Sequence, residues 1–200
     1  MSRKLIVATG NRGKVKEINA IVAEMGFDVQ SLLDLEGAPE IIEDRDTFEG
    51  NAAKKAQTVF DVFGVPTLAD DSGLVVDALD GAPGVYSARY GGPGLSDIER
   101  YEKLLHELRD VPDEQRTARF ECALAFVETG TPPRIFRGTI EGKISYSPSG
   151  DNGFGYDPVF IPIERQCTMA ELSDENKKKI SHRGRALRAF EKWLKQTVDQ

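Results

Sequence analysis

Two adjacent aspartates, Asp70 and Asp71, stand between two apolar runs of the sequence. Removing an ionised carboxylate from water without a partner is very costly, so we expect a cation near each of them. If the stretch is a strand, neighbouring side chains point to opposite faces, and the two aspartates then have different roles. A divalent metal bound to a phosphorylated substrate would supply such a cation. The plainer interpretation is an Asp-Ser-Gly turn between two strands, because such turns are common.

A second candidate lies near the start of the chain. Residues 5–8 form an apolar run typical of a buried strand, and a turn that ends at Asn11 leads into apolar residues at helical spacing. Backbone N–H groups at such a helix start often bind phosphate. Arg12, Lys14 and Lys16 oppose the helix dipole there, and a bound anion would remove the conflict. The alternative is a solvated basic helix start with Asn11 as an ordinary N-cap, and the sequence favours neither.

Charges are unevenly distributed along the chain. Residues 34–49 carry seven acidic side chains and one basic one, whereas residues 177–195 carry eight Lys or Arg and one Glu. The two segments suit the metal side and the phosphate or base side of one site, but solvated helix faces are the commoner cause.

A helix is predicted after the acidic segment. Asp46 and Glu49 stand at the spacing of a capping box, and apolar side chains follow at helical spacing. Lys54 or Lys55 of this helix could point at phosphate, although exposed lysines on helices are usually solvated.

Two later segments could surround a nucleobase. Glycines flank Phe154, and an aromatic ring near Asp157 suits a stacked, hydrogen-bonded base. The alternative is a turn with Phe154 or Tyr156 packed in the core. His182 and Arg183 can donate to purine ring acceptors or to phosphate. They precede Gly184, whose place inside a predicted helix indicates a break or a close neighbour.

The remaining pattern predicts a long antiparallel hairpin from residues 116–127 and 136–144, which alternate between apolar and polar side chains. Gly138 and Gly142 fall on the apolar face of the second strand, where they predict bends or close approach of another segment. Cys122 falls on the apolar face of the first strand and is interpreted as a small core residue.

Composition limits the class of protein. The chain has 200 residues, of which 40% are hydrophobic and 30% charged, enough for one domain or one domain with two lobes. The net charge of −7 disfavours general binding of nucleic acid. Two cysteines predict no disulfide framework. We expect no signal peptide, and no apolar stretch approaches the roughly 20 residues that span a bilayer, so a cytoplasmic setting is the default.

Five motifs occur in order along the chain, and together they resemble the inosine/xanthosine triphosphate pyrophosphatase family, which removes non-standard purine nucleotides. Each motif is weak alone, but the similarity extends over almost the whole chain. The motifs are TGNRGK at 9–14, DDSG at 70–73, GAPGVYSARY at 81–90, GFGYDP at 153–158 and SHRG at 181–184.

The resemblance implies a single two-lobed domain over residues 1–200 of the α/β class. Its fold would be an elongated, twisted mixed β-sheet with flanking helices and a central cleft between the lobes. The protein would be a homodimer that hydrolyses ITP, dITP and XTP to the monophosphate and pyrophosphate. Mg²⁺ is the expected metal because the candidate ligands are hard carboxylates and phosphate oxygens, without a Cys/His cluster.

The resemblance also implies roles for single residues. Asp71 would be a metal ligand and the general base, while the role of Asp70 stays open. Glu43 would be the second metal ligand, although Asp44 and Asp46 compete for this assignment. Lys55, rather than Lys54, matches the family's catalytic helix lysine. The triphosphate would be bound by Thr9, Gly10, Asn11, Arg12, Gly13 and Lys14. The sugar and base would be surrounded by Ser72, Phe154, Gly155, Tyr156, Asp157, Lys177, His182 and Arg183.

Three other functions fit parts of the sequence. A pyrophosphatase for modified pyrimidine nucleotides would share the phosphate and metal groups, but the residues around Phe154 and His182 disfavour it. A nucleotide sensor without catalysis has less need of carboxylates at a metal. An RNA-binding module could use the basic C-terminal segment, but the net charge and the lack of an RNA-fold motif disfavour it.

Overall fold

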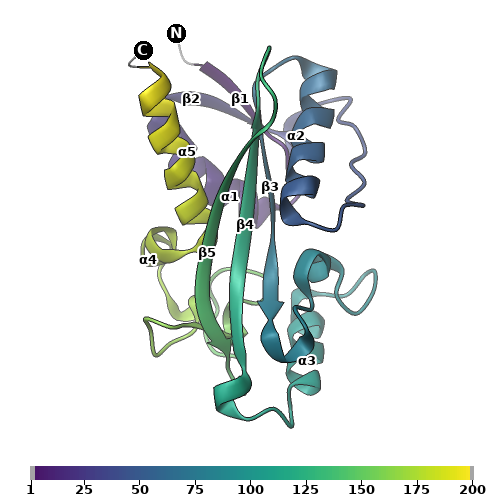
Figure 1. The fold of residues 1–200 in the computed structure, drawn as a ribbon, viewed down its shortest axis with the longest axis vertical. Helices are drawn as coiled ribbons and strands as arrows, with labels where there is room; N and C mark the ends of the chain where they lie inside the picture. Colours follow the sequence, from purple (N-terminus) through teal and green to yellow (C-terminus); the bar gives the residue numbers. More distant parts are fainter. Residues whose placement is uncertain (1–2, 199–200) are drawn as a thin grey trace. The chain divides into compact units, whose positions relative to one another are not determined.

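The computed structural model describes residues 3–198 of the chain (Figure 1). These residues divide into two compact units. Within the described residues, unit 1 comprises 3–71, 122–138 and 183–198, and unit 2 comprises 72–121 and 139–182.

One mixed sheet contains the six strands, in the order β2-β1-β3-β4-β5-β6. β1 pairs in parallel with β2 and with β3, whereas β6 pairs antiparallel with β5. This confirms the predicted α/β class with a mixed sheet, and the two strands of the predicted hairpin are neighbours as β4 and β5. The strands are β1 Arg3–Val7, β2 Phe27–Ser31, β3 Thr67–Val76, β4 Thr117–Val127, β5 Arg134–Ile144 and β6 Phe160–Pro162.

The side chains of Asn11, Thr47, Ser96 and Ser173 cap the starts of four helices. The helices are α1 Arg12–Val22, α2 Phe48–Phe63, α3 Asp97–Glu107, α4 Asp174–Ile180 and α5 His182–Val198. Short 3₁₀ turns lie at Ala23–Met25, Leu32–Asp34, Asp77–Leu79, Gly84–Arg89, Asp113–Gln115, Asp157–Val159 and Met169–Glu171. None of the helices in residues 3–198 is both long and apolar enough to span a membrane.

Two expectations about helix ends are corrected. The N-cap of α2 is Thr47, whose hydroxyl accepts a hydrogen bond from the backbone N–H of Gly50 at 3.1 Å, and not Asp46. A break is one of the two interpretations of Gly184, but the break lies at Ser181, whose extended backbone separates α4 from α5, and Gly184 lies inside α5.

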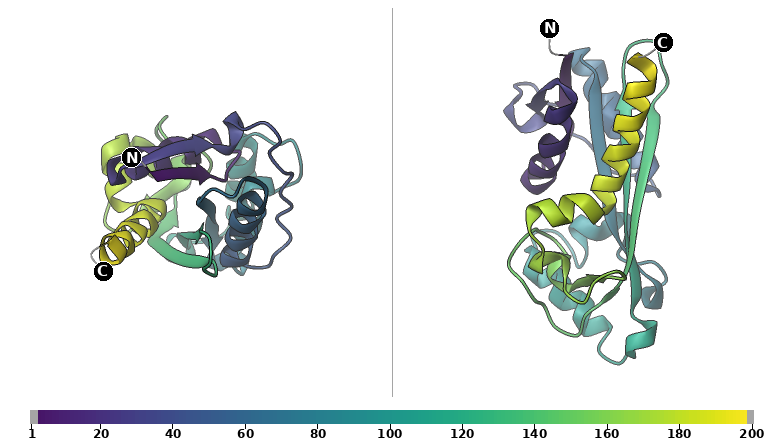
Figure 2. Two further views of the ribbon diagram at one scale, coloured as in Figure 1. Left: turned by 90° about the horizontal axis from the view of Figure 1, so that it is seen from above. Right: turned by 90° about the vertical axis from the view of Figure 1, so that its left-hand side faces the viewer.

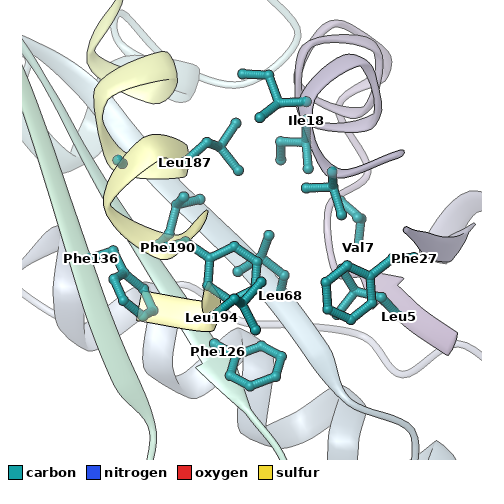
Figure 3. Packing of buried hydrophobic residues seen from close by; sticks show 14 of the residues in the cluster. Leu5, Val7, Ile18, Phe27, Leu68, Phe126, Phe136, Leu187, Phe190 and Leu194 are labelled. Carbon is teal, nitrogen blue, oxygen red and sulfur yellow. The ribbon is translucent and has the colours of Figure 1, made fainter. Parts of the chain in front are cut away.

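The core of unit 1 forms where α1 and α5 pack on the strands. Figure 3 shows Leu187, Phe190 and Leu194 of α5 facing apolar side chains of the sheet and of α1. The opposing side chains include Leu5, Val7, Ile18, Phe27, Leu68, Phe126 and Phe136. α2 lies on the other side of the unit 1 strands (Figures 1 and 2). The strands of unit 1 therefore have a helix layer on each face.

The core of unit 2 is built on α3, the first half of β4 and the ends of β5 and β6. Its buried side chains include Leu104, Leu108, Phe120, Ile140, Ile144, Tyr156, Phe160 and Met169. A Cβ on Gly142 would lie 2.3 Å from the carbonyl oxygen of Ile161. The close approach predicted at this glycine is confirmed.

Arg116, just before β4, joins separate segments of unit 2. Its guanidinium donates to the backbone carbonyls of Leu108 at 2.6 Å, Ile144 at 2.9 Å and Ser145 at 2.8 Å. The guanidinium carbon also lies 4.3 Å from the ring centre of Tyr146. The buried cation is thus solvated by carbonyl dipoles and an aromatic face.

Candidate active site

The centre of the candidate site is β3, which carries both aspartates in the middle of a ten-residue strand. The expected turn at Asp-Ser-Gly is therefore wrong, because β3 continues as a strand through these residues between β1 and β4. Asp70 contacts Lys14 and Arg183, whereas Asp71 contacts Lys55. The expected difference between the two carboxylates is confirmed by these separate partners.

Asp71 shares the ammonium group of Lys55 with Glu43. Nζ of Lys55 lies 2.6 Å from Oε1 of Glu43 and 3.3 Å from Oδ1 of Asp71. Among residues 3–198, Oδ2 of Asp71 is buried and has no hydrogen-bond partner. Oδ1 is thus held by a cation, whereas Oδ2 makes no hydrogen bond within this part of the chain.

The helix α2 and the loop before it position this group. Lys55 is buried on α2 and only 6% exposed. The side chain of Asn51 binds both the backbone N–H and the carbonyl of Arg45, which fixes the end of the acidic loop on α2. Lys54 instead pairs with the exposed Asp44 at 2.8 Å. The geometry thus brings together Glu43, Lys55 and Asp71, out of the competing candidates of the sequence.

Burial and charge act in opposite directions on this group. Burial raises the pKa of Asp71, and the nearby Lys55 and Lys14 offset only part of that increase. Burial alone would lower the pKa of Lys55, but Asp71 and Glu43 outweigh it, so the pKa is raised. The lysine therefore stays a cation at neutral pH beside a carboxylate that is easier to protonate than usual.

The segment from Thr9 to Lys14 is held by its own side chains. The buried Thr9 hydroxyl accepts from the backbone N–H of Asn11 at 3.2 Å, and Oδ1 of Asn11 accepts from that of Lys14 at 3.0 Å. Asn11 is thus the N-cap of α1, as one of the two sequence interpretations has it. Gly10 and Arg12 are exposed and Gly13 is half-buried. Phosphate binding here stays a prediction.

Asp70 meets several donors on the other face of β3. Nζ of Lys14 lies 2.5 Å from its Oδ1, and Nε of Arg183 donates to its Oδ2 at 2.9 Å. Burial alone would raise the pKa of Asp70, but Arg183 and Lys14 hold it well below its ordinary value. Arg183 also pairs with Glu17 of α1. Arg183, expected at the base, has its guanidinium on these two carboxylates, and its predicted contact with the base stays a prediction.

Unit 2 brings together three residues of the predicted base site. Oδ2 of Asp157 accepts from the backbone N–H of Phe154 at 2.8 Å and from Nζ of Lys177 at 2.6 Å. Nζ of Lys177 also lies 4.8 Å from the ring centre of Phe154. His182 of the same unit stacks on Phe120, with ring centres 4.8 Å apart and planes inclined by 12°.

Tyr156, predicted beside the base, is placed differently. Tyr156 is buried in the core of unit 2, and its hydroxyl donates to the carbonyl of Ser87 at 2.9 Å. This bears out the interpretation of Tyr156 as a core residue that supports the loop, and its contact with substrate stays a prediction. Ser72, which follows Asp71 in β3, is half-buried, and Gly155 has a φ of 63°.

Sequence reasoning missed three residues around these groups. Cys122 is buried as expected, but its thiol also donates to Oδ2 of Asp70 at 3.1 Å. Glu17 forms an ion pair with Arg183, and Phe120 stacks on the ring of His182. The alternation of the predicted strand identifies Cys122 as a core residue, but no local pattern indicates which polar group a core residue contacts.

Comparison with known proteins finds a family and relatives that match most of the chain. The Ham1 family profile matches residues 5–193. The dITP/XTP pyrophosphatase of Halalkalibacterium halodurans is 48% identical over 192 residues, which are 96% of this chain and 99% of the relative. The dITP/XTP pyrophosphatase of Geobacter sulfurreducens is 53% identical over 184 residues, 92% of each chain.

A solved structure agrees with these sequences. The Ham1 protein of Staphylococcus aureus superposes with a TM-score of 0.87 at 36% identity, covering 98% of this chain and 100% of that one. The family resemblance inferred from the five motifs is confirmed. This chain belongs to the Ham1 family.

Proposed function

We propose that this protein is a nucleoside triphosphate pyrophosphatase that hydrolyses dITP, ITP and XTP to the monophosphate and pyrophosphate. It would thereby remove non-standard purine nucleotides from the nucleotide pool. The observation that carries the proposal is the buried Asp71, with one oxygen on Lys55 and the other without a hydrogen-bond partner among residues 3–198. Relatives about half identical to this chain are named dITP/XTP pyrophosphatases, which supports the same substrates here.

The carboxylates fit Mg²⁺ as the metal, with Asp71 and Glu43 as its ligands. Oδ2 of Asp71 is buried and available, and carboxylate oxygens are the ligands that Mg²⁺ prefers. Residues 3–198 contain no group of three or more His, Cys, Asp or Glu that could hold a metal. Mg²⁺ commonly binds through one or two carboxylates and is completed by waters and substrate phosphates. The bound ion would polarise phosphate oxygens and neutralise their charge.

The proposed reaction uses the chain's own groups around the phosphates. Asp71 accepts the proton of a water that attacks the α-phosphorus, as a general base that lies beside the reacting group. The bond between the α-phosphorus and the bridging oxygen breaks, and pyrophosphate leaves. Lys55, a cation held beside Asp71, stabilises the negative charge that develops on the phosphates. The exposed start of α1 and Arg12 bind the outer phosphates.

The residues of unit 2 suit the sugar and base. The half-buried Phe154 offers a ring for stacking, and Lys177 and His182 offer donors. Donors that face a 6-keto oxygen would face the 6-amino group of adenine without a partner. Such a mismatch can discriminate by about 10⁴-fold.

The proposal extends to the assembly. The Ham1 profile spans segments of both units, which supports one catalytic domain with two lobes. The resemblance to the pyrophosphatase family supports a homodimer that works in the cytoplasm. Light scattering during size-exclusion chromatography tests the dimer.

The direct test is pyrophosphate release from dITP, ITP, XTP, GTP, ATP and dTTP, with Mg²⁺ and again with EDTA. We expect fast release from the first three, at least tenfold slower release from ATP, which carries a 6-amino group, and loss of activity in EDTA. A rate for ATP comparable to that for dITP would contradict the proposed base selection, whereas GTP shares the 6-keto oxygen and shows whether the 2-amino group is excluded as well. Tight binding of ITP without any release would identify a binding protein instead of an enzyme.

A glycine substitution tests the base side of the proposal. A Cβ on Gly153 would lie 2.1 Å from Oδ2 of Asp157 and 3.1 Å from Nζ of Lys177. Gly153→Ala must therefore displace the carboxylate that holds both Lys177 and the backbone of Phe154. We expect KM for dITP to rise about tenfold, because small displacements of binding groups are costly.

Gly94→Ala is the matched control for this variant. Gly94 has a φ of 81°, against 80° for Gly153, but its Cβ would have no heavy atom within 4 Å. Both variants carry the strain of a positive φ, so a difference in KM reports the displaced carboxylate. Equal KM values for the two variants would contradict a role of Asp157 in ordering the base site.

A further inference from the structure

Asp70 has no obvious task in the reaction, although it is the most deeply buried acid of the candidate site. Its side chain is 0% exposed. Oδ1 lies 2.5 Å from Nζ of Lys14 and 3.5 Å from Nη2 of Arg183. Oδ2 accepts from Nε of Arg183 at 2.9 Å and from the thiol of Cys122 at 3.1 Å. Both oxygens are therefore surrounded by donors.

Asp70 belongs to a cluster of paired charges within unit 1. It pairs with the cations Lys14 and Arg183, and Arg183 pairs in turn with the anion Glu17. A buried cluster of this kind is stable only while every charge keeps its partners. The removal of Asp70 therefore leaves Lys14 without the carboxylate that holds its ammonium group.

Lys14 connects Asp70 to the segment at 9–14. The backbone N–H of Lys14 binds Asn11, and the N–H of Asn11 binds Thr9. The side chain of the same lysine reaches across to β3. Side chains therefore hold the segment at both of its ends. Its ion pair with β3 is made at Asp70, the residue next to Asp71.

We propose that Asp70 is a positioning residue, which acts through Lys14 to hold the segment at 9–14 in place beside Asp71 and which does not bind the metal. The inference rests on the proposed function, because it assigns this segment to the triphosphate. The alternation of β3 supports the second part: Asp71 meets Lys55 of α2, whereas Asp70 meets residues of α1, α5 and β4. An oxygen already surrounded by cationic donors is also a poor metal ligand.

The test is a double-mutant cycle with Asp70→Asn, Lys14→Met and the double variant. kcat, KM for dITP and the Mg²⁺ concentration for half-maximal rate are measured for each. If Asp70 acts through Lys14, each single variant raises KM about tenfold, and the double variant stays within about threefold of Lys14→Met. The half-maximal Mg²⁺ concentration of Asp70→Asn stays within about twofold of the wild type, because no metal ligand is lost.

A control separates the lysine from the rest of the cluster. Cys122→Ala removes the weakest donor to Asp70 and leaves Lys14 in place. We expect its KM to stay within about twofold of the wild type. A rise in KM equal to that of Asp70→Asn would show that any disturbance of the cluster has the same effect, and would overturn the specific role of Lys14.

Several outcomes overturn the proposal. A double variant that loses a further tenfold or more relative to Lys14→Met would show that Asp70 acts by another route. A tenfold increase in the half-maximal Mg²⁺ concentration of Asp70→Asn would make Asp70 a metal ligand. If Asp70→Asn does not fold, the double variant, which loses one charge of each sign, is compared with Lys14→Met alone. Unfolding of that double variant would identify Asp70 as purely structural.

Failure of the proposed function would look different. In that case the wild type releases no pyrophosphate from dITP, ITP or XTP. The same cycle is then measured as dissociation constants for inorganic tripolyphosphate, a probe of the segment at 9–14 that needs no catalysis. Equal losses in Lys14→Met and in the double variant would still support the positioning role, and additive losses would overturn it.

Discussion

Replacing Asp71 by asparagine is expected to lower kcat for pyrophosphate release from dITP about 10³-fold. Oδ1 of Asp71 lies 3.3 Å from Nζ of Lys55, and Oδ2 is buried without a hydrogen-bond partner among residues 3–198. An asparagine must direct its NH₂ group either at the lysine or to the position left for a further ligand. Both orientations place a donor where an acceptor is needed.

The measurement is pyrophosphate release at saturating dITP and Mg²⁺. Asp46→Asn is the matched control, because Asp46 belongs to the same acidic segment as Glu43 but is exposed. We expect this control to stay within about twofold of the wild type. A loss of less than tenfold in Asp71→Asn would be incompatible with Asp71 as the base and metal ligand, whatever the control does.

The second large effect concerns stability. Arg116→Met is expected to lower the free energy of unfolding by about 3 kcal/mol. The carbonyls of Leu108, Ile144 and Ser145 would each lose a donor inside unit 2, and methionine cannot replace any of these hydrogen bonds. Arg116→Lys should recover only part of the loss, since one ammonium group cannot reach all the carbonyls that a planar fork reaches.

Arg119→Met provides the comparison, three residues further along. Arg119 pairs with Asp77 at 3.0 Å and with Glu121 at 2.7 Å, but its side chain is 32% exposed. Exposed ion pairs contribute about 0 to 1 kcal/mol, so this variant should cost less than about 1 kcal/mol. Urea denaturation of both variants tests the ranking. Equal losses would show that the carbonyl network of Arg116 is not a major source of stability.

Patterns of neighbouring residues predict the strands and helix ends that depend mainly on nearby sequence. The apolar run at 5–8, the cap at Asn11 and the alternating strands β4 and β5 all appear where expected. Thr47 shows the limit of such patterns. Asp46 and Thr47 are both good capping residues, and the choice depends on which backbone N–H the side chain reaches once the loop is placed.

The sequence leaves the turn open as an interpretation of residues 70–73, because the partners of the two aspartates are distant in the sequence. Arg183 and Lys14 neutralise Asp70 from α5 and α1, and Lys55 neutralises Asp71 from α2. Without these cations, two carboxylates in a buried strand would be too costly. The choice of Lys55 over Lys54 could be inferred from the family motif, and the structure gives its physical basis: Lys54 extends to the exposed Asp44.

Because successive side chains of β3 point to opposite faces, the roles of Asp70 and Asp71 depend on the exact length of this strand. Deleting Leu68, between Thr67 and Ala69, would shift the rest of the strand by one residue. Asp71 would then take the position of Asp70, and a serine would face Lys55. Inserting one residue there would do the reverse, leaving an aspartate at Lys55 and an alanine beside Lys14. Apolar positions of β3 should therefore accept substitution far more readily than any change of length. Related chains should differ in length in connections away from the site, such as residues 128–133, and not here.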